Sequence, residues 1–155
     1  MKKSSVSILR VMVALVFVAC IAIISCKKDK SEDPPVKTKK ELLANKWKVA
    51  DIQDASGNSL INLPVDQIKC LKDNIFTIVS DATYSIDEGA VVCDPTTAGS
   101  GTWTLSENDT QITFTPTTGD PLTITLIDVT ETTLKVSYYL SEPVPGTYTV
   151  ILQKQ

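Results

Sequence analysis

Short segments in which apolar and β-branched residues alternate with polar ones follow each other from Trp47 to the end of the chain. Turn residues separate these segments, and alternation with a period of two is typical of a strand with one buried face. Gly89, inside the third segment, predicts a β-bulge. We predict eight strands, at residues 46–53, 75–79, 83–92, 101–105, 111–115, 122–129, 133–140 and 147–153.

The later strands each have one apolar face, while their opposite faces hold mainly Thr, Ser, Lys and Gln. The apolar faces are Ile112 and Phe114; Leu122, Ile124 and Leu126; Leu134, Val136, Tyr138 and Leu140; and Tyr148, Val150 and Leu152. One dry and one wet face per strand indicate an antiparallel sheet, and short links favour an up-and-down meander. Closure removes the exposed sheet edges, so the sequence predicts an all-β, eight-stranded antiparallel up-and-down barrel. Such a barrel is either packed with side chains or holds one small ligand.

The residues before the first strand predict a short helix. Thr38 and Glu41 have the spacing of a capping box, and Leu42 and Leu43 follow them. We therefore expect one or two helical turns that end at about Asn45. Residues 60–73 are less regular, which predicts a long loop with a helical turn at residues 64–69.

Cys70 and Cys93 are predicted to form a disulfide. Both lie about eleven or twelve positions from Asp81-Ala82, the expected tip of a hairpin, so they would meet at the open end of that hairpin. An exported chain enters an oxidising compartment, where such a pair becomes oxidised. The alternative is a redox or metal pair, but the chain has no His and no CxxC motif.

Residues 1–25 predict a secretory signal peptide. Lys2, Lys3 and Arg10 precede an uncharged run at residues 11–24, which is shorter than the about 20 apolar residues that a membrane-spanning helix needs. Together with the motif at its end, described next, this run favours a lipoprotein signal peptide; the alternatives are an ordinary signal peptide with an incidental Cys and a retained transmembrane anchor.

The run ends in Ile23-Ile24-Ser25-Cys26, which resembles the lipobox of bacterial lipoproteins. Cys20 fits that motif less well because it lies inside the apolar run and has Phe17 three positions before it. The resemblance implies cleavage before Cys26 and acylation of its thiol. Several acyl chains would hold the mature protein firmly on a membrane without spanning it.

Residues 26–37 are charged and contain Pro34-Pro35, so they predict a lipidated Cys followed by a flexible tether. Residues 38–155 then form one domain. The Lys and acidic cluster after Cys26 also resembles the signal that exports lipoproteins of the Bacteroidota to the cell surface; plain linker chemistry is the alternative. We therefore expect an outer-membrane lipoprotein on the periplasmic or cell-surface side.

Charge and composition exclude several functions. The whole chain has 15 basic and 18 acidic residues, and residues 41–155 hold six Lys against 15 acidic residues. An acidic domain repels phosphates, so we expect no nucleic-acid partner. The absence of His removes the commonest general base and metal ligand. Hence we expect no catalysis, no cofactor and no metal site, while the oligomeric state stays open.

The sequence resembles the lipocalin-like lipoproteins of the Bacteroidota in four features: Trp47 at the start of the first strand, residues 70–76 (CLKDNIF), Gly89 before Cys93, and residues 101–105 (GTWTL). The resemblance implies a calyx that the N-terminal turn and Trp47 close at one end. It also implies a basic residue over that indole, for which Lys154 is the candidate.

Two functions compete for such a barrel. A calyx would bind a small hydrophobic or amphipathic ligand, and its interior candidates are Trp103, Phe114, Tyr138 and Tyr148. A barrel with a filled core would instead bind a partner protein or glycan through its outer, Thr-rich faces. Catalysis is not indicated, because the carboxylates of Asp87-Glu88 and of residues 107–109 lie in turn or bulge sequences that favour such residues anyway.

Overall fold

The structure is a computed structural model that describes residues 35–141 and 144–155. The predicted signal peptide, the lipidation site at Cys26 and nearly all of the tether lie outside these residues. Within the described ranges, none of the helices has both the length and the apolar character that a membrane crossing requires.

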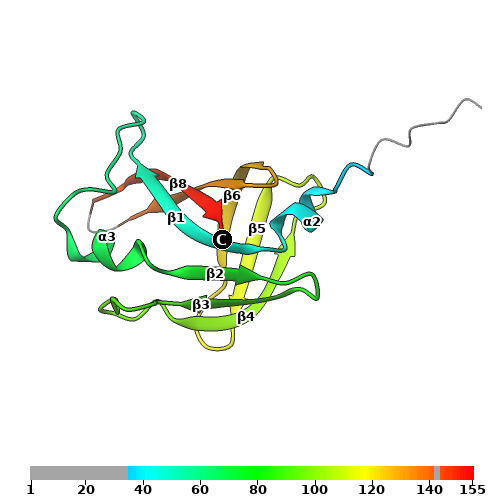
Figure 1. Cartoon of the computed structure of the whole chain (residues 1–155), viewed down its shortest axis with the longest axis horizontal. Coiled ribbons are helices and arrows are strands. Elements are labelled where there is room, and N and C mark those ends of the chain that lie inside the picture. The colour runs from blue at the N-terminus through cyan, green and yellow to red at the C-terminus, as the bar shows by residue number, and fades with distance from the viewer. Residues whose placement is uncertain (1–34, 142–143) are drawn as a thin grey trace, which may run out of the picture. The chain divides into compact units, whose positions relative to one another are not determined.

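Eight antiparallel strands pair in sequence order, and β8 pairs with β1 to close a barrel (Figure 1). The strands are β1 (Lys46–Gln53), β2 (Ile75–Ile78), β3 (Thr83–Asp87), β4 (Gly99–Leu105), β5 (Gln111–Pro116), β6 (Leu122–Val129), β7 (Thr133–Leu140) and β8 (Gly146–Lys154). The predicted all-β, up-and-down barrel is thus confirmed. The predicted bounds of the first, sixth and seventh strands agree with those of β1, β6 and β7.

The predicted third strand is too long. β3 ends at Asp87, and Gly89 lies in the loop that follows instead of forming a bulge inside the strand. Gly89 has a φ of +65°, and a Cβ there would lie 2.8 Å from Oδ2 of Asp73. The strand therefore ends at a turn that packs closely against Asp73 and that only glycine adopts easily.

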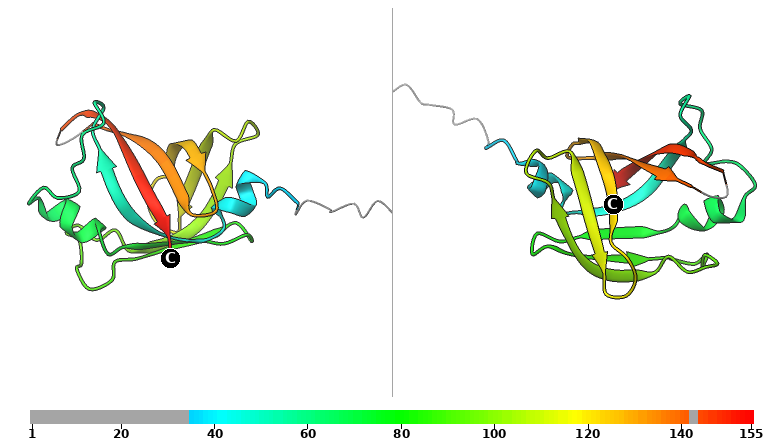
Figure 2. Two further views of the ribbon diagram at one scale, coloured as in Figure 1. Left: turned by 45° about the horizontal axis from the view of Figure 1, so that its top comes forward. Right: turned by 180° about the vertical axis from the view of Figure 1, so that it is seen from behind.

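Two short helices lie at opposite ends of the barrel (Figure 2). α2 (Lys39–Leu43) has the predicted capping box, because Oγ1 of Thr38 accepts from the backbone N–H of Glu41 and Oε2 of Glu41 accepts from that of Thr38. α3 (Asp66–Leu71) lies in the β1–β2 connection, two residues later than predicted.

The two cysteines form the predicted disulfide. Cys70 of α3 bonds to Cys93 of the β3–β4 loop, and their Cα atoms are 5.2 Å apart. Both side chains are buried. The bond therefore fastens α3 to the loop beside it.

We expect the double substitution Cys70→Ser with Cys93→Ser to lower the free energy of unfolding by about 3 kcal/mol, because the bond restricts the unfolded chain. Urea denaturation of the oxidised proteins measures this difference. Wild-type protein with a reductant should unfold at the midpoint of the double variant. Equal midpoints for the oxidised wild type and the double variant would contradict the prediction.

Candidate functional site

One end of the barrel, which we call the closed end, is filled by two tryptophans. Trp47 and Trp103 are buried, with 0% and 1% of their surface exposed. The indole N–H of Trp47 donates to the carbonyl of Leu43 in α2, and that of Trp103 donates to the carbonyl of Val79, both at 2.9 Å. Both polar groups are satisfied, so the rings serve as core at this end. The closure predicted for the N-terminal turn and Trp47 is therefore present.

The cation next to a tryptophan in the described residues is Lys40, whose Nζ lies 6.0 Å from the ring centroid of Trp103. Lys154 lies opposite Trp47 in the β1–β8 register and is exposed. The expected stacking of Lys154 over Trp47 is absent from the described part of the chain. The ammonium group of Lys154 is instead exposed, and its charge helps to lower the pKa of Glu131 in the neighbouring β6–β7 loop.

The inward-facing side chains become more exposed toward the other end, which we call the open end. On β6, Leu126 is buried, Ile124 is half-buried and Leu122 is exposed. β7 shows the same order, from the buried Leu134 and Val136 through the half-buried Tyr138 to the exposed Leu140. On β8, Leu152 is buried, whereas Val150 and Tyr148 are both half-buried. Loops 54–74, 88–98, 117–121 and 141–145 meet at this end, because connections in an up-and-down barrel alternate between its ends.

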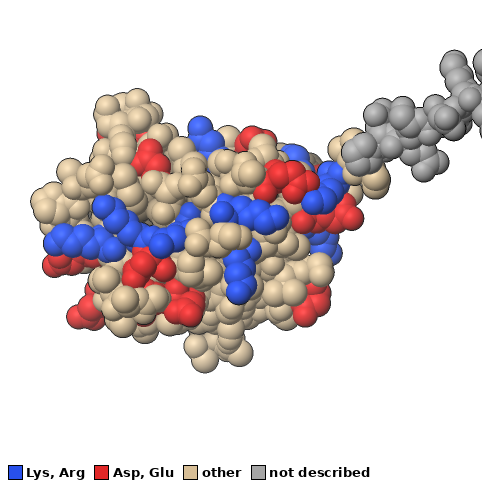
Figure 3. Space-filling view, in the orientation of Figure 1, with Lys and Arg blue, Asp and Glu red and all other residues tan. Residues whose placement is uncertain are grey.

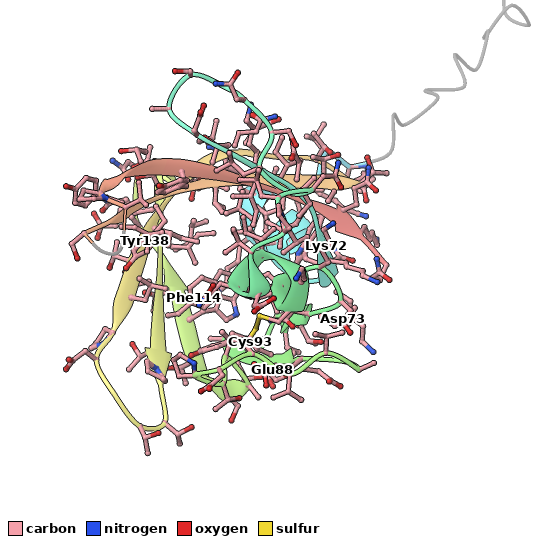
Figure 4. All side chains as sticks on the ribbon, turned by 90° about the vertical axis from the view of Figure 1, so that its left-hand side faces the viewer. Lys72, Asp73, Glu88, Cys93, Phe114 and Tyr138 are labelled. Atoms are coloured by element: carbon pink, nitrogen blue, oxygen red, sulfur yellow. A yellow bond between two sulfur atoms is a disulfide. The ribbon has the colours of Figure 1, made fainter. Side chains whose placement is uncertain are left out.

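Aromatic residues line the open end. The rings of Tyr84 and Phe114 are in edge-to-face contact, with centroids 4.9 Å apart, and Tyr138 lies opposite Tyr148 in the β7–β8 register. Figure 4 views this end, with Phe114 and Tyr138 labelled. Burial raises the pKa of Tyr84, so its phenol stays neutral.

Three of the four predicted ligand residues therefore lie at the open end: Phe114, Tyr138 and Tyr148. Trp103 is different, because it belongs to the buried core. It nevertheless lies opposite Phe114 in the β4–β5 register. A fluorophore thus lies next to the aromatic lining.

A buried carboxylate organises the β3–β4 loop beside the disulfide. Glu88 is only 6% exposed, and it accepts hydrogen bonds from the backbone N–H and hydroxyl of Thr97, from the hydroxyl of Thr96 and from the backbone N–H of Cys93. The backbone bond from Thr97 and the hydroxyl bond from Thr96 are the main causes that lower the pKa of Glu88 to about 2. Glu88 is therefore ionised and acts as a hydrogen-bond acceptor.

Its ionisation fixes the direction of a longer hydrogen-bond chain. The hydroxyl of Thr97 donates to Glu88, so it accepts from Nδ2 of Asn74, at 2.8 Å. Asn74 is fully buried, and its Oδ1 has no hydrogen-bond partner among the described residues. An acceptor buried in this way favours a partner that carries an N–H or O–H donor.

A second carboxylate holds the same loop from the β2 side. Oδ2 of Asp73 accepts from the backbone N–H groups of Ala90 and Val91, at 2.8 and 3.0 Å. Sequence reasoning missed the roles of Asp73, Asn74 and Glu88, because residues of these types are common in ordinary turns. The sequence did mark Asp73 and Asn74, as part of the motif at residues 70–76 and directly before an apolar strand, but neither signal identified their hydrogen-bond partners. Within the described ranges, no three His, Cys, Asp or Glu side chains could together hold a metal ion.

Charge is distributed unevenly over the barrel. Residues 75–129, which form β2 to β6, contain no Lys or Arg, and the Lys residues after Glu41 are on β1, on or directly after α3, and on β7 and β8. Figure 3 shows one face of the molecule, on which a band of these cations crosses β1 and α3. The aromatic lining contributed by β3 to β6 therefore has no cation on its own strands, so it suits an uncharged group.

Comparison with known proteins gives two findings. The family model of the lipocalin-like domain matches residues 43–136. The crystal structure of a lipocalin-like protein from Bacteroides uniformis is similar to this structure, with a TM-score of 0.50 and 18% sequence identity; the match covers 74% of this chain and 99% of that chain. No curated protein matches the chain.

Glu88 is expected to make the stability of the barrel depend on acid. Its pKa in the folded state is about 2, below its ordinary value of 4.5, so its contribution is fully present above pH 4.5 and is lost as the pH falls toward about 2. Glu88→Gln should unfold at lower urea concentration than wild type at neutral pH, and the difference should shrink across this window.

Urea midpoints between neutral pH and about pH 2 measure this difference. Glu107→Gln, a substitution of an exposed turn residue outside the network, is the matched control and should follow the wild type. If the difference in urea midpoint between wild type and Glu88→Gln stays constant as the pH falls, the lowered pKa of Glu88 is refuted.

Proposed function

The chain belongs to the family of lipocalin-like domains, and from that premise we propose that its barrel binds one small hydrophobic or amphipathic molecule at the open end. The observation that carries the proposal is the graded burial of the inward-facing side chains. A barrel filled by its own side chains would bury them along its whole length. Here Tyr138 is only half-buried and Leu140 is exposed, although both face inward with the buried Val136.

The filled closed end limits the size of the ligand. Trp47 and Trp103 occupy that end together with the buried core, so a ligand has access only to the open half. On β7 this half corresponds to residues 137–140, a length of about 13 Å at about 3.3 Å per residue. A ring system or a chain of medium length fits this depth better than a long extended chain.

The polar groups at the open end favour an amphipathic ligand. The buried Oδ1 of Asn74 could accept a hydrogen bond from a hydroxyl or amide group. The cation-free strands β2 to β6 favour a buried part without negative charge. An uncharged apolar molecule with a hydrogen-bond donor would satisfy both conditions.

We expect Phe114→Ala to weaken ligand binding about tenfold, through lost apolar contact. The emission of Trp103, next to Phe114, is the readout, titrated with a panel of fatty acids, sterols and haem. Tyr138→Ala should have a similar effect. Ile127→Ala is the matched control, because Ile127 follows the buried Leu126 on β6, is itself exposed and lies away from the open end.

Equal affinities of wild type and the Phe114→Ala variant would contradict this site. If no member of the panel binds, and native mass spectra of the natively purified protein contain no ligand, the binding function itself fails.

The same proposal includes no catalytic role. General acid catalysis at neutral pH needs a carboxyl whose pKa is raised. The buried carboxyl of Glu88 has its pKa lowered to about 2, and it is fully engaged by hydrogen bonds from its own loop. Glu88 is therefore suited to holding the loop in place.

We also propose that acylation of Cys26 anchors the domain to the outer membrane. The support is the sequence Ile23-Ile24-Ser25-Cys26 directly after an uncharged run. Cys26→Ala should move the protein from the membrane fraction to the soluble fraction, while Cys20→Ala should leave the amount of protein in the membrane fraction unchanged. Fractionation and intact mass of the mature chain measure this. A Cys26→Ala protein with the same acyl mass as wild type would contradict the anchor.

A further inference from the structure

Exposed apolar side chains gather around the open end. Val92 in the β3–β4 loop is 68% exposed, and Val144 in the β7–β8 loop is 63% exposed. Each of the four connections at this end contributes at least one exposed apolar side chain, either from the loop itself or from the adjoining end of a strand. We call the set the rim: Leu63, Val65, Val91, Val92, Leu122, Tyr139, Leu140 and Val144.

The loops of the closed end have a different composition. Residues 106–110 read Ser-Glu-Asn-Asp-Thr, and residues 130–132 read Thr-Glu-Thr. Toward the closed end, the exposed large apolar side chains are fewer and separate from each other in sequence: Val36 before α2, Val79 in the β2–β3 loop and Ile127 on β6. Exposed apolar side chains scattered over a surface need no explanation, but a ring of them around one opening indicates an interaction site.

We propose that the rim docks onto a lipid bilayer, with its side chains in the boundary between headgroups and acyl chains. This inference rests on the proposed ligand site, because it adds a route by which a poorly soluble molecule reaches that site. The composition of the rim favours lipid over a protein partner. Protein interfaces are enriched in Trp, Tyr and Arg, whereas the rim holds Val and Leu with a single Tyr.

Charges beside the rim have both signs. Lys69 and Lys72 lie on or directly after α3, and Asp94 and Asp120 lie in two neighbouring loops. Lys69 is paired with Asp66, at 2.8 Å. Attraction to anionic lipid is therefore balanced by repulsion, and apolar insertion must supply the affinity. Docking should accordingly occur on neutral phosphatidylcholine and depend little on salt.

The length of the N-terminal segment permits this arrangement. The 12 residues from Cys26 to Lys37 can span at most about 40 Å. The eight residues of β7 measure about 26 Å. A domain tethered by its N-terminus can therefore turn its far end toward the membrane that holds the anchor, and the rim can meet that same membrane.

The test places a fluorophore on the rim of the full, lipidated chain. Val92→Trp and Val144→Trp variants are reconstituted in phosphatidylcholine vesicles with and without brominated acyl chains, which quench tryptophan on contact. Glu107→Trp, at the exposed β4–β5 turn of the closed end, is the matched control. Trp47 and Trp103 are buried, and their constant emission is measured on the parent chain.

We expect the added emission of both rim variants to fall about twofold in brominated vesicles, while that of Glu107→Trp stays unchanged. The quenching should persist at high salt. Equal quenching at both ends, or none at the rim, would overturn the docking proposal. If the rim variants are quenched but no ligand binds in the fluorescence titration, the ligand site alone is refuted. If a ligand binds but the rim variants are not quenched, docking alone is refuted.

Discussion

The pairing of β1 with β8 is the interaction on which the rest of the structure depends. It converts a meander into a closed barrel, in which each of the eight described strands pairs with a neighbouring strand on both sides. Closure also gives the molecule an inside and two ends. α2 and two tryptophans occupy one end, and a polar network with a disulfide partly covers the other. The two ends therefore differ in chemistry although the strands between them are continuous.

The open end is stabilised by polar interactions more than by packing. Glu88 collects hydrogen bonds from its own loop, Asp73 binds the same loop from β2, and the Cys70–Cys93 bond holds α3 against it. These interactions fix one side of the open end. The opposite side, formed by β5 to β8, keeps its apolar side chains half-exposed. One side held by polar contacts and one apolar side are the features on which the proposed capture of a small molecule rests.

The parts of the fold that follow from local pattern could be predicted. β6 and β7 alternate strictly, and the capping box of Thr38 and Glu41 is a local motif, so their positions follow from the sequence. Val91 and Val92 have the composition of a strand, and only the turn at Gly89, packed against Asp73, removes them from β3. Their exposure was therefore not predictable from composition.

The candidate site likewise has features that follow from local sequence pattern and features that depend on the folded structure. Alternation along β5, β7 and β8 identified Phe114, Tyr138 and Tyr148 as inward-facing, but it could not rank their burial, which depends on where α2 closes the barrel. The chain from Asn74 through Thr97 to Glu88 joins three separate segments, so no local signal marks it. Lys40 and Lys154 could not be distinguished as partners of an indole, because that depends on where the folded closed end places each ammonium group.

The central claim is that the open half of the barrel contains space bounded by apolar side chains. Diffraction from crystals pressurised with xenon tests this directly, since xenon occupies apolar cavities. The account predicts a xenon site inside the barrel between Phe114 and Tyr138. An interior in which these side chains meet across the barrel, with no xenon bound, would contradict it.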